Sequence, residues 1–93
     1  MIIKADLSPL MQRTVDKGIT FMISQSGQPG YYNLHFAKYV LSNKAVHLQF
    51  HEEEQTAYQY ADGEHPVIAF NNIDEVLAYV SAGLDVEAKE ETD

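Results

Sequence analysis

Apolar and polar residues alternate through the middle of the chain, as in β-strands that bury one face and expose the other. In ITFMISQ, for example, Ile19, Phe21 and Ile23 share one face, and Thr20 and Met22 lie on the other. The same period predicts further strands over residues 31–41, 45–51 and 55–61. A last strand is expected over residues 65–70, where Pro66 favours the edge of a sheet.

Helical spacing replaces alternation near both ends of the chain. Ser8 is expected to cap a first helix with Pro9 at its first position, and Gly18 is expected to end it. Its apolar stripe comprises Leu7, Leu10, Met11 and Val15. In the second helix, Asn72 and Glu75 form a capping-box pattern, and Gly83 is the expected end. Its stripe comprises Ile73, Val76, Leu77 and Val80.

Strand register follows from the requirement that neighbouring strands bury the same face. A three-residue loop, Ser42 to Lys44, satisfies it for the strands on either side. The expected pairs are then Phe36 with Phe50, Val40 with Val46, Tyr39 with His47, and His35 with His51.

A second three-residue loop, Glu52 to Glu54, is expected before the next strand, whose tyrosines would join the buried face. Leu48 would face Tyr58 and Val46 would face Tyr60, and Asp62-Gly63 is a strong hairpin signal. The resulting fold class is α+β: a four- to five-stranded antiparallel meander with an N-terminal and a C-terminal helix packed on one face. We expect one domain over residues 1–84 and an acidic, disordered tail over residues 85–93.

Composition narrows the classes of function. The chain has 93 residues and no cysteine, which excludes a disulfide framework and a cysteine nucleophile. No signal-like start or membrane-length apolar run is present, so we expect a cytoplasmic protein without a membrane partner. The formal net charge of −8 argues against binding to nucleic acid. Residues 18–51 nevertheless contain no acid, and their only lysines or arginines are Lys38 and Lys44.

The four histidines raise the question of a metal site. His47 and His51 would stand about 13 Å apart on one strand, too far to share an ion. His35 and His51 could meet across strands with Glu53 nearby, but a structural zinc site normally has four ligands. We therefore expect no metal and no cofactor.

Catalytic patterns are also lacking. The three glutamates of the loop at 52–54 are expected in an exposed turn where nothing desolvates them. No Ser–His–Asp constellation can be placed, and SGQPG lacks the length and the lysine of a phosphate-binding loop. These observations predict a protein that is not an enzyme.

The face opposite the helices carries almost no charge, and its aromatic residues and Met22 are typical of an interface core. The interface candidates are Met22, Tyr31, Asn33, His35, Tyr39, His47, Gln49, His51, Gln55 and Gln59, and Ala57 is expected on the same face. Acidic candidates beside it are Glu52, Glu53, Glu54, Asp62 and Glu64.

The sequence thus predicts a small acidic protein-binding module, an inhibitor or regulator that occupies a partner's surface. The partner is another protein or a second copy, bound through this face or an edge strand. Mimicry of nucleic acid, as in phage-encoded acidic inhibitors, is an analogy of size and charge only. The alternative is a single-stranded nucleic-acid binder that stacks bases on Tyr31, Tyr39 and His47.

Overall fold

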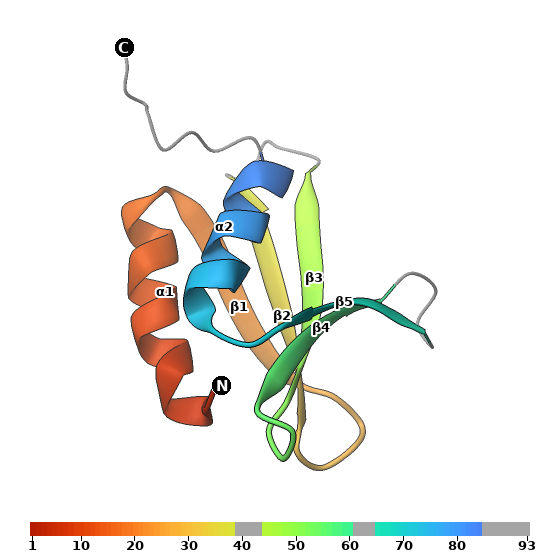
Figure 1. Ribbon diagram of the computed structural model, residues 1–93. Coiled ribbons are helices and arrows are strands. Elements are labelled where there is room, and N and C mark those ends of the chain that lie inside the picture. The colour runs from red at the N-terminus through yellow and green to blue at the C-terminus, as the bar shows by residue number, and fades with distance from the viewer. Residues whose placement is uncertain (39–43, 61–64, 85–93) are drawn as a thin grey trace.

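A computed structural model describes residues 1–38, 44–60 and 65–84 of the chain (Figure 1). Five antiparallel strands form one sheet in the order β1-β2-β3-β4-β5. They are β1 (Ile19–Gln25), β2 (Tyr31–Lys38), β3 (Ala45–His51), β4 (Thr56–Tyr60) and β5 (Pro66–Phe70). A 3-10 turn η1 (Lys4–Asp6) and helix α1 (Leu7–Asp16) precede the sheet, and helix α2 (Ile73–Gly83) follows it. The expected α+β meander is confirmed; residues 39–41, the Asp62-Gly63 turn and the tail lie outside the described ranges.

Helix α1 begins earlier than the sequence suggests. The carboxylate of Asp6 accepts a hydrogen bond from the Ile3 backbone N–H, which closes η1 and leads directly into α1 at Leu7. Ser8 therefore lies inside the helix and Pro9 is its third residue, so the predictions of a Ser8 cap and of Pro9 at the first position are both wrong. Gly18 adopts a left-handed conformation (φ 77°) after the helix, as predicted.

The buried face of α1 also differs from the expected stripe. Leu7 and Leu10 are buried, but Met11 is 36% exposed and Val15 is 57% exposed. Thr14 is fully buried instead, because its hydroxyl donates to the Met11 carbonyl at 2.8 Å and so needs no water. Two apolar residues of α1 therefore remain on the surface.

Helix α2 forms as its capping residues predict. The Asn72 side chain accepts a hydrogen bond from the Glu75 backbone N–H at 2.9 Å, and the Glu75 carboxylate accepts from the Asn71 N–H. Val76, Leu77 and Val80 are buried, Ile73 is partly buried, and the helix ends at Gly83. Both helices pack on the same face of the sheet and contact each other (Figure 1).

The register of β2 against β3 differs from the prediction. Phe36 faces Val46 rather than Phe50, Tyr32 faces Phe50, and the last pair is Ala37 with Ala45. The ladder also continues at its opposite end, where the Glu52 N–H donates to the Gly30 carbonyl, and residues 39–43 of the connection lie outside the described ranges. The displacement is by an even number of residues, so the predicted buried faces of both strands survive.

The register of β4 changes which residues are buried. Its turn includes Gln55, which adopts φ 55°, and the pairs are Gln49 with Tyr58 and Phe50 with Ala57. This turn is one residue longer than the expected three-residue loop, so the residues expected on the inner face of β4 lie on its outer face and the reverse. The prediction that Tyr58 and Tyr60 face the core is therefore wrong, as is the prediction that Ala57 faces outward.

Strand β5 is an edge strand, as Pro66 indicates, and it pairs with β4 through an irregularity between Gln59 and Tyr60. The described β3–β4 ladder covers only Gln49 to His51 of β3. Beyond it the β4–β5 hairpin turns away from the rest of the sheet (Figure 1).

Candidate interaction face

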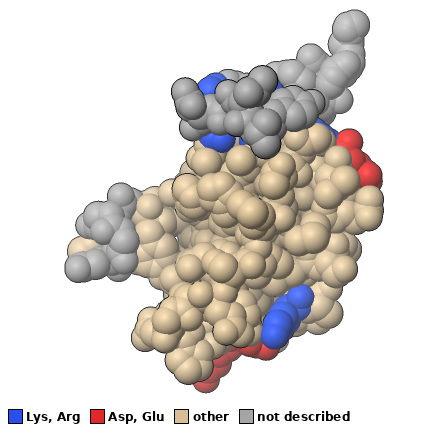
Figure 2. All heavy atoms as spheres, turned by 180° about the vertical axis from the view of Figure 1, so that it is seen from behind, with Lys and Arg blue, Asp and Glu red and all other residues tan. Residues whose placement is uncertain are grey.

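The sheet face opposite the helices, called the outer face below, lacks Lys, Arg, Asp and Glu among its described strand residues. The ladders place its side chains in rows across the strands. One row is Thr20, Ala37 and Ala45; the next is Met22, His35 and His47; a third is Ser24, Asn33, Gln49, Tyr58 and Ala69; a fourth is Tyr31, His51 and Thr56. Figure 2 shows the molecule from behind as a broad uncharged surface with charged side chains near its rim.

His51 lies at the centre of an aromatic cluster on this face. It is only 5% exposed, although the sequence places it outward on an open sheet. Tyr31 stacks on its ring with 4.2 Å between centroids and 10° between planes, and Tyr58 covers it at 4.6 Å. Tyr60 completes the cluster, with its ring centroid 6.2 Å from that of His51. Tyr31, His51, Tyr58 and Tyr60 are called the His51 cluster below.

Hydrogen bonds fix the cluster to its neighbours. Nε2 of His51 lies 2.9 Å from the Gln49 amide oxygen and 3.1 Å from the Tyr60 hydroxyl. Nδ1 of His51 is buried without a hydrogen-bond partner, and the closest carboxylate oxygen, from Glu54, is 3.7 Å away. The Tyr58 hydroxyl donates to the other oxygen of Glu54 at 2.5 Å. A carboxylate therefore borders one side of the cluster.

Hydrogen bonds and burial set the charge states of the tyrosines and the glutamate in this arrangement. The hydrogen bond to Glu54 raises the pKa of Tyr58, and burial raises the pKa of Tyr60, with Tyr31 and Glu54 adding to the effect. The same bond from Tyr58 lowers the pKa of Glu54. These shifts keep both phenols protonated and the carboxylate ionised near neutral pH.

A second histidine contact lies one row away. Nδ1 of His35 is 2.6 Å from Nε2 of His47, so one imidazole donates an N–H to the other. Burial lowers the pKa of His35, and the neighbouring His47 lowers it further. The expected pairs His35 with His51 and Tyr39 with His47 are thus wrong; His35 faces His47, and Tyr31 faces His51.

The structure collects only part of the predicted interface. Met22, Tyr31, Asn33, His35, His47, Gln49 and His51 share the outer face. Gln55 lies in the turn after β3, Gln59 lies on the helix side of β4, and Tyr39 is outside the described residues. Sequence reasoning missed Tyr58 and Tyr60, although their alternation with Ala57 and Gln59 was visible. The missing signal was the left-handed Gln55, which lengthens the turn.

The acidic loop borders the outer face at one end. Glu52, Glu53 and Glu54 are all exposed, as expected for a turn. Glu54 holds Tyr58, and Glu52 accepts a weak hydrogen bond from the Tyr32 hydroxyl at 3.3 Å. Asp62 and Glu64 fall outside the described residues.

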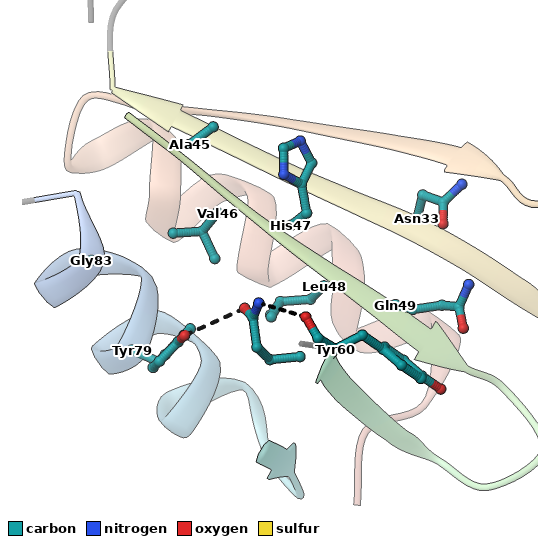
Figure 3. A pocket seen from close by; sticks show the side chains of 10 residues that line it. Asn33, Ala45, Val46, His47, Leu48, Gln49, Tyr60, Tyr79 and Gly83 are labelled. Carbon is teal, nitrogen blue, oxygen red and sulfur yellow. Dashed lines mark hydrogen bonds between the residues drawn. The ribbon is translucent and has the colours of Figure 1, made fainter. Parts of the chain in front are cut away.

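A pocket of about 600 Å³ opens where β4 leaves β3 (Figure 3). The Gln59 amide spans it, accepting from the Tyr79 hydroxyl at 3.4 Å and donating to the Tyr60 carbonyl at 3.3 Å. Its other lining residues are Asn33, Ala45, Val46, His47, Leu48, Gln49 and Gly83. No lining residue is Lys, Arg, Asp or Glu, so the pocket offers amide, hydroxyl and imidazole groups for hydrogen bonding.

Within the described ranges, no three histidine or carboxylate side chains come close enough together to hold a metal ion. In the same part of the chain, neither helix combines the length and apolar character that a membrane crossing requires. Comparisons with protein-family profiles, curated proteins and solved structures find no match.

Proposed function

We propose that this protein is a non-enzymatic binding module whose outer face occupies the surface of another protein. The observation that carries the proposal is the His51 cluster on a face whose described strand residues include no Lys, Arg, Asp or Glu. Aromatic residues enriched and charges depleted at the centre of a surface are the compositional mark of an interface core. Tyrosine is also a favoured interface anchor, because its ring buries area while its hydroxyl remains able to form hydrogen bonds.

The acidic loop defines the chemistry of the partner. Glu52, Glu53 and Glu54 are exposed beside the His51 cluster. A complementary surface has an apolar or hydrogen-bonding centre and lysine or arginine side chains at the edge that meets this loop. Rim charges of this kind chiefly accelerate association and select partners, while the neutral centre supplies the affinity. Such a module acts as an inhibitor or regulator by covering the surface it binds.

Single-stranded nucleic acid is the alternative, because tyrosines on an open sheet can stack bases. Tyr58 and Tyr60 strengthen that alternative compared with the sequence prediction. Glu54 is hydrogen-bonded to Tyr58, so its negative charge would repel the phosphates of a strand whose bases stack on that tyrosine. The protein partner therefore fits the face better.

Site-specific photocrosslinking in native lysate tests the proposal. A benzophenone amino acid replaces Ala69, an exposed outer-face residue opposite Tyr58, in the full chain. We expect discrete crosslinked protein species that disappear when Tyr58→Glu is introduced and that weaken at high salt. The matched control carries the same group at Gln12, which is exposed on α1. Equal crosslinking from both positions, or none from Ala69, contradicts the proposal.

A fluorescent single-stranded oligonucleotide separates the two classes of partner. We expect no binding at low salt. Tight binding that collapses as salt is added, with a slope that reports phosphate contacts, would assign the face to nucleic acid instead.

A further inference from the structure

The two edges of the sheet are built differently. β5 has five residues, begins with Pro66 and pairs irregularly with β4. β1 has seven residues, ITFMISQ, with no proline, no charge and an unbroken register against β2. Natural sheets protect their edges with charges, prolines, bulges or short strands, because an unprotected edge pairs with another strand. Among the described residues, β1 carries none of these protections.

Backbone hydrogen-bonding groups of β1 point out of the sheet at this edge, at the exposed Ile23 and Gln25 and at the buried Ile19 and Phe21. The Ser26 N–H donates to the Tyr31 carbonyl at 3.0 Å, which continues the β1–β2 ladder beyond its last strand pair. In an antiparallel ladder, every second residue directs its N–H and C=O groups to the same neighbouring strand. Ser24, Met22 and Thr20 therefore also direct theirs to β2. Ile19, Phe21, Ile23 and Gln25 therefore direct theirs away from the sheet. From Met22 to Gln25 the strand is also exposed.

Helix α1 adds an apolar flank on the same side. Arg13 pairs with Asp74 of α2, so the Arg13 side of α1 faces α2. At about 100° per residue, Met11 and Val15 lie on the opposite flank, with the buried Leu7, Leu10 and Thr14 between the two sides. The exposed Met11 and Val15 thus point away from α2, toward the side of the molecule where β1 is the edge strand. Together with Met22 and Ile23, they form half of the large exposed apolar residues of the described chain.

Charge makes a second copy of this chain the best occupant of the edge. The chain has a net charge of −8, so most contacts between two copies bring like charges together. Pairing of β1 with β1 brings none, because the strand has no charged residue. An antiparallel pair of identical strands also satisfies the two-fold symmetry that most dimers adopt.

We propose that two copies of this protein join their β1 strands antiparallel about a two-fold axis through Met22, forming one continuous sheet. In this register Met22 faces Met22 of the second copy, and Phe21 faces its Ile23. All seven residues of β1 pair, inner residues stay on the inner face, and the two α1 flanks face each other across the axis. The inference does not rest on the proposed function. It places both outer faces on the same side of the continuous sheet.

The chain contains no cysteine, so single cysteines can map this register directly. Met22 and its symmetry mate form a non-hydrogen-bonded pair, with Cα atoms about 4.5 Å apart, within disulfide range. Met22→Cys should therefore form a covalent dimer rapidly under mild oxidation. Ser24→Cys is the matched control: it is exposed on the same face of β1, but its two copies would stand about 13 Å apart along the strand.

We expect at least tenfold faster crosslinking of Met22→Cys than of Ser24→Cys. When Thr20→Cys and Ser24→Cys are mixed, we expect a disulfide between the two different variants. The wild type should sediment at twice 10.5 kDa, and circular dichroism should confirm that each variant is folded. A wild type that sediments as a monomer at high micromolar concentration overturns the proposal. Equal crosslinking rates for Met22→Cys and Ser24→Cys overturn it as well. The oligomeric state is measured on the isolated protein, so failure here leaves the proposed partner binding untouched.

Discussion

His35 shows how one side chain couples this fold to pH. Its imidazole is half-buried, and its Nδ1 lies 2.6 Å from Nε2 of His47. Burial first and His47 second lower the pKa of His35 below its ordinary value of 6.5. If both rings were protonated, two N–H donors would face each other, so the shared hydrogen bond exists only while one ring is neutral.

This depressed pKa predicts that acid destabilises the fold. Between the folded and unfolded pKa values of His35 the unfolded chain binds more protons, so stability falls as pH drops below about 6.5. His35→Gln should flatten that part of the profile. His47→Gln should flatten it only in part, because burial, the larger cause, remains. Urea denaturation from pH 7.5 to 5 measures both slopes. An unchanged slope in His35→Gln would contradict the assignment.

At the scale of the element, local signals were predictable from sequence. The Asn72 cap and the left-handed Gly18 depend on residues within a few positions of each other, and both form as predicted. The prediction of a Ser8 cap failed because Asp6 closes an earlier turn by accepting a hydrogen bond from the Ile3 N–H. The pattern of apolar and polar residues carries no signal for that contact. Alternation also assigned the buried faces of β2 and β3 correctly, since those faces depend only on each strand's own period.

Register was less predictable, because it is set by the whole ladder and by turn geometry. Several even displacements of β2 against β3 bury the same residues, so hydrophobic pattern could not choose among them. For β4 the pattern offered two faces, one with tyrosines and one with Ala57 and Gln59. The tyrosine rings offered more apolar area to bury, yet Ala57 is the residue that lies fully buried between Phe50 and Phe70. The candidate site was therefore found in part, with Tyr31 but without Tyr58 and Tyr60.

The face of β4 can be tested by a pair of matched substitutions. Ala57 is fully buried between its partners Phe50 and Phe70, so Ala57→Leu should overpack the core and destabilise the protein by about 1–3 kcal/mol. Ala69→Leu makes the same change on the exposed outer face and should alter stability by less than about 0.5 kcal/mol. Chemical denaturation measures both. The reverse order would mean that the tyrosines face the core.

At the scale of the whole molecule, charge and apolar surface are separated. The described acids of the loop after β3 lie at one end of the outer face, and the strands themselves keep charges off that face. The exposed apolar residues of α1 and β1 lie at one side edge. These surfaces share only Met22, so a chain of this size can pair with a second copy through its edge and still present most of its outer face to a partner.

Pairing through β1 also makes thermal stability depend on concentration. If unfolding starts from the dimer, a tenfold rise in concentration stabilises each chain by about 0.7 kcal/mol and raises Tm by roughly 3–5 °C. Gln25→Pro should abolish this dependence, because the Gln25 N–H points away from β2, and proline removes a donor needed only by the second copy. At the lowest concentration the variant and the wild type should melt together. Differential scanning fluorimetry across two decades of concentration measures the slope, and an equal slope in both proteins would place any dimer contact elsewhere than at β1.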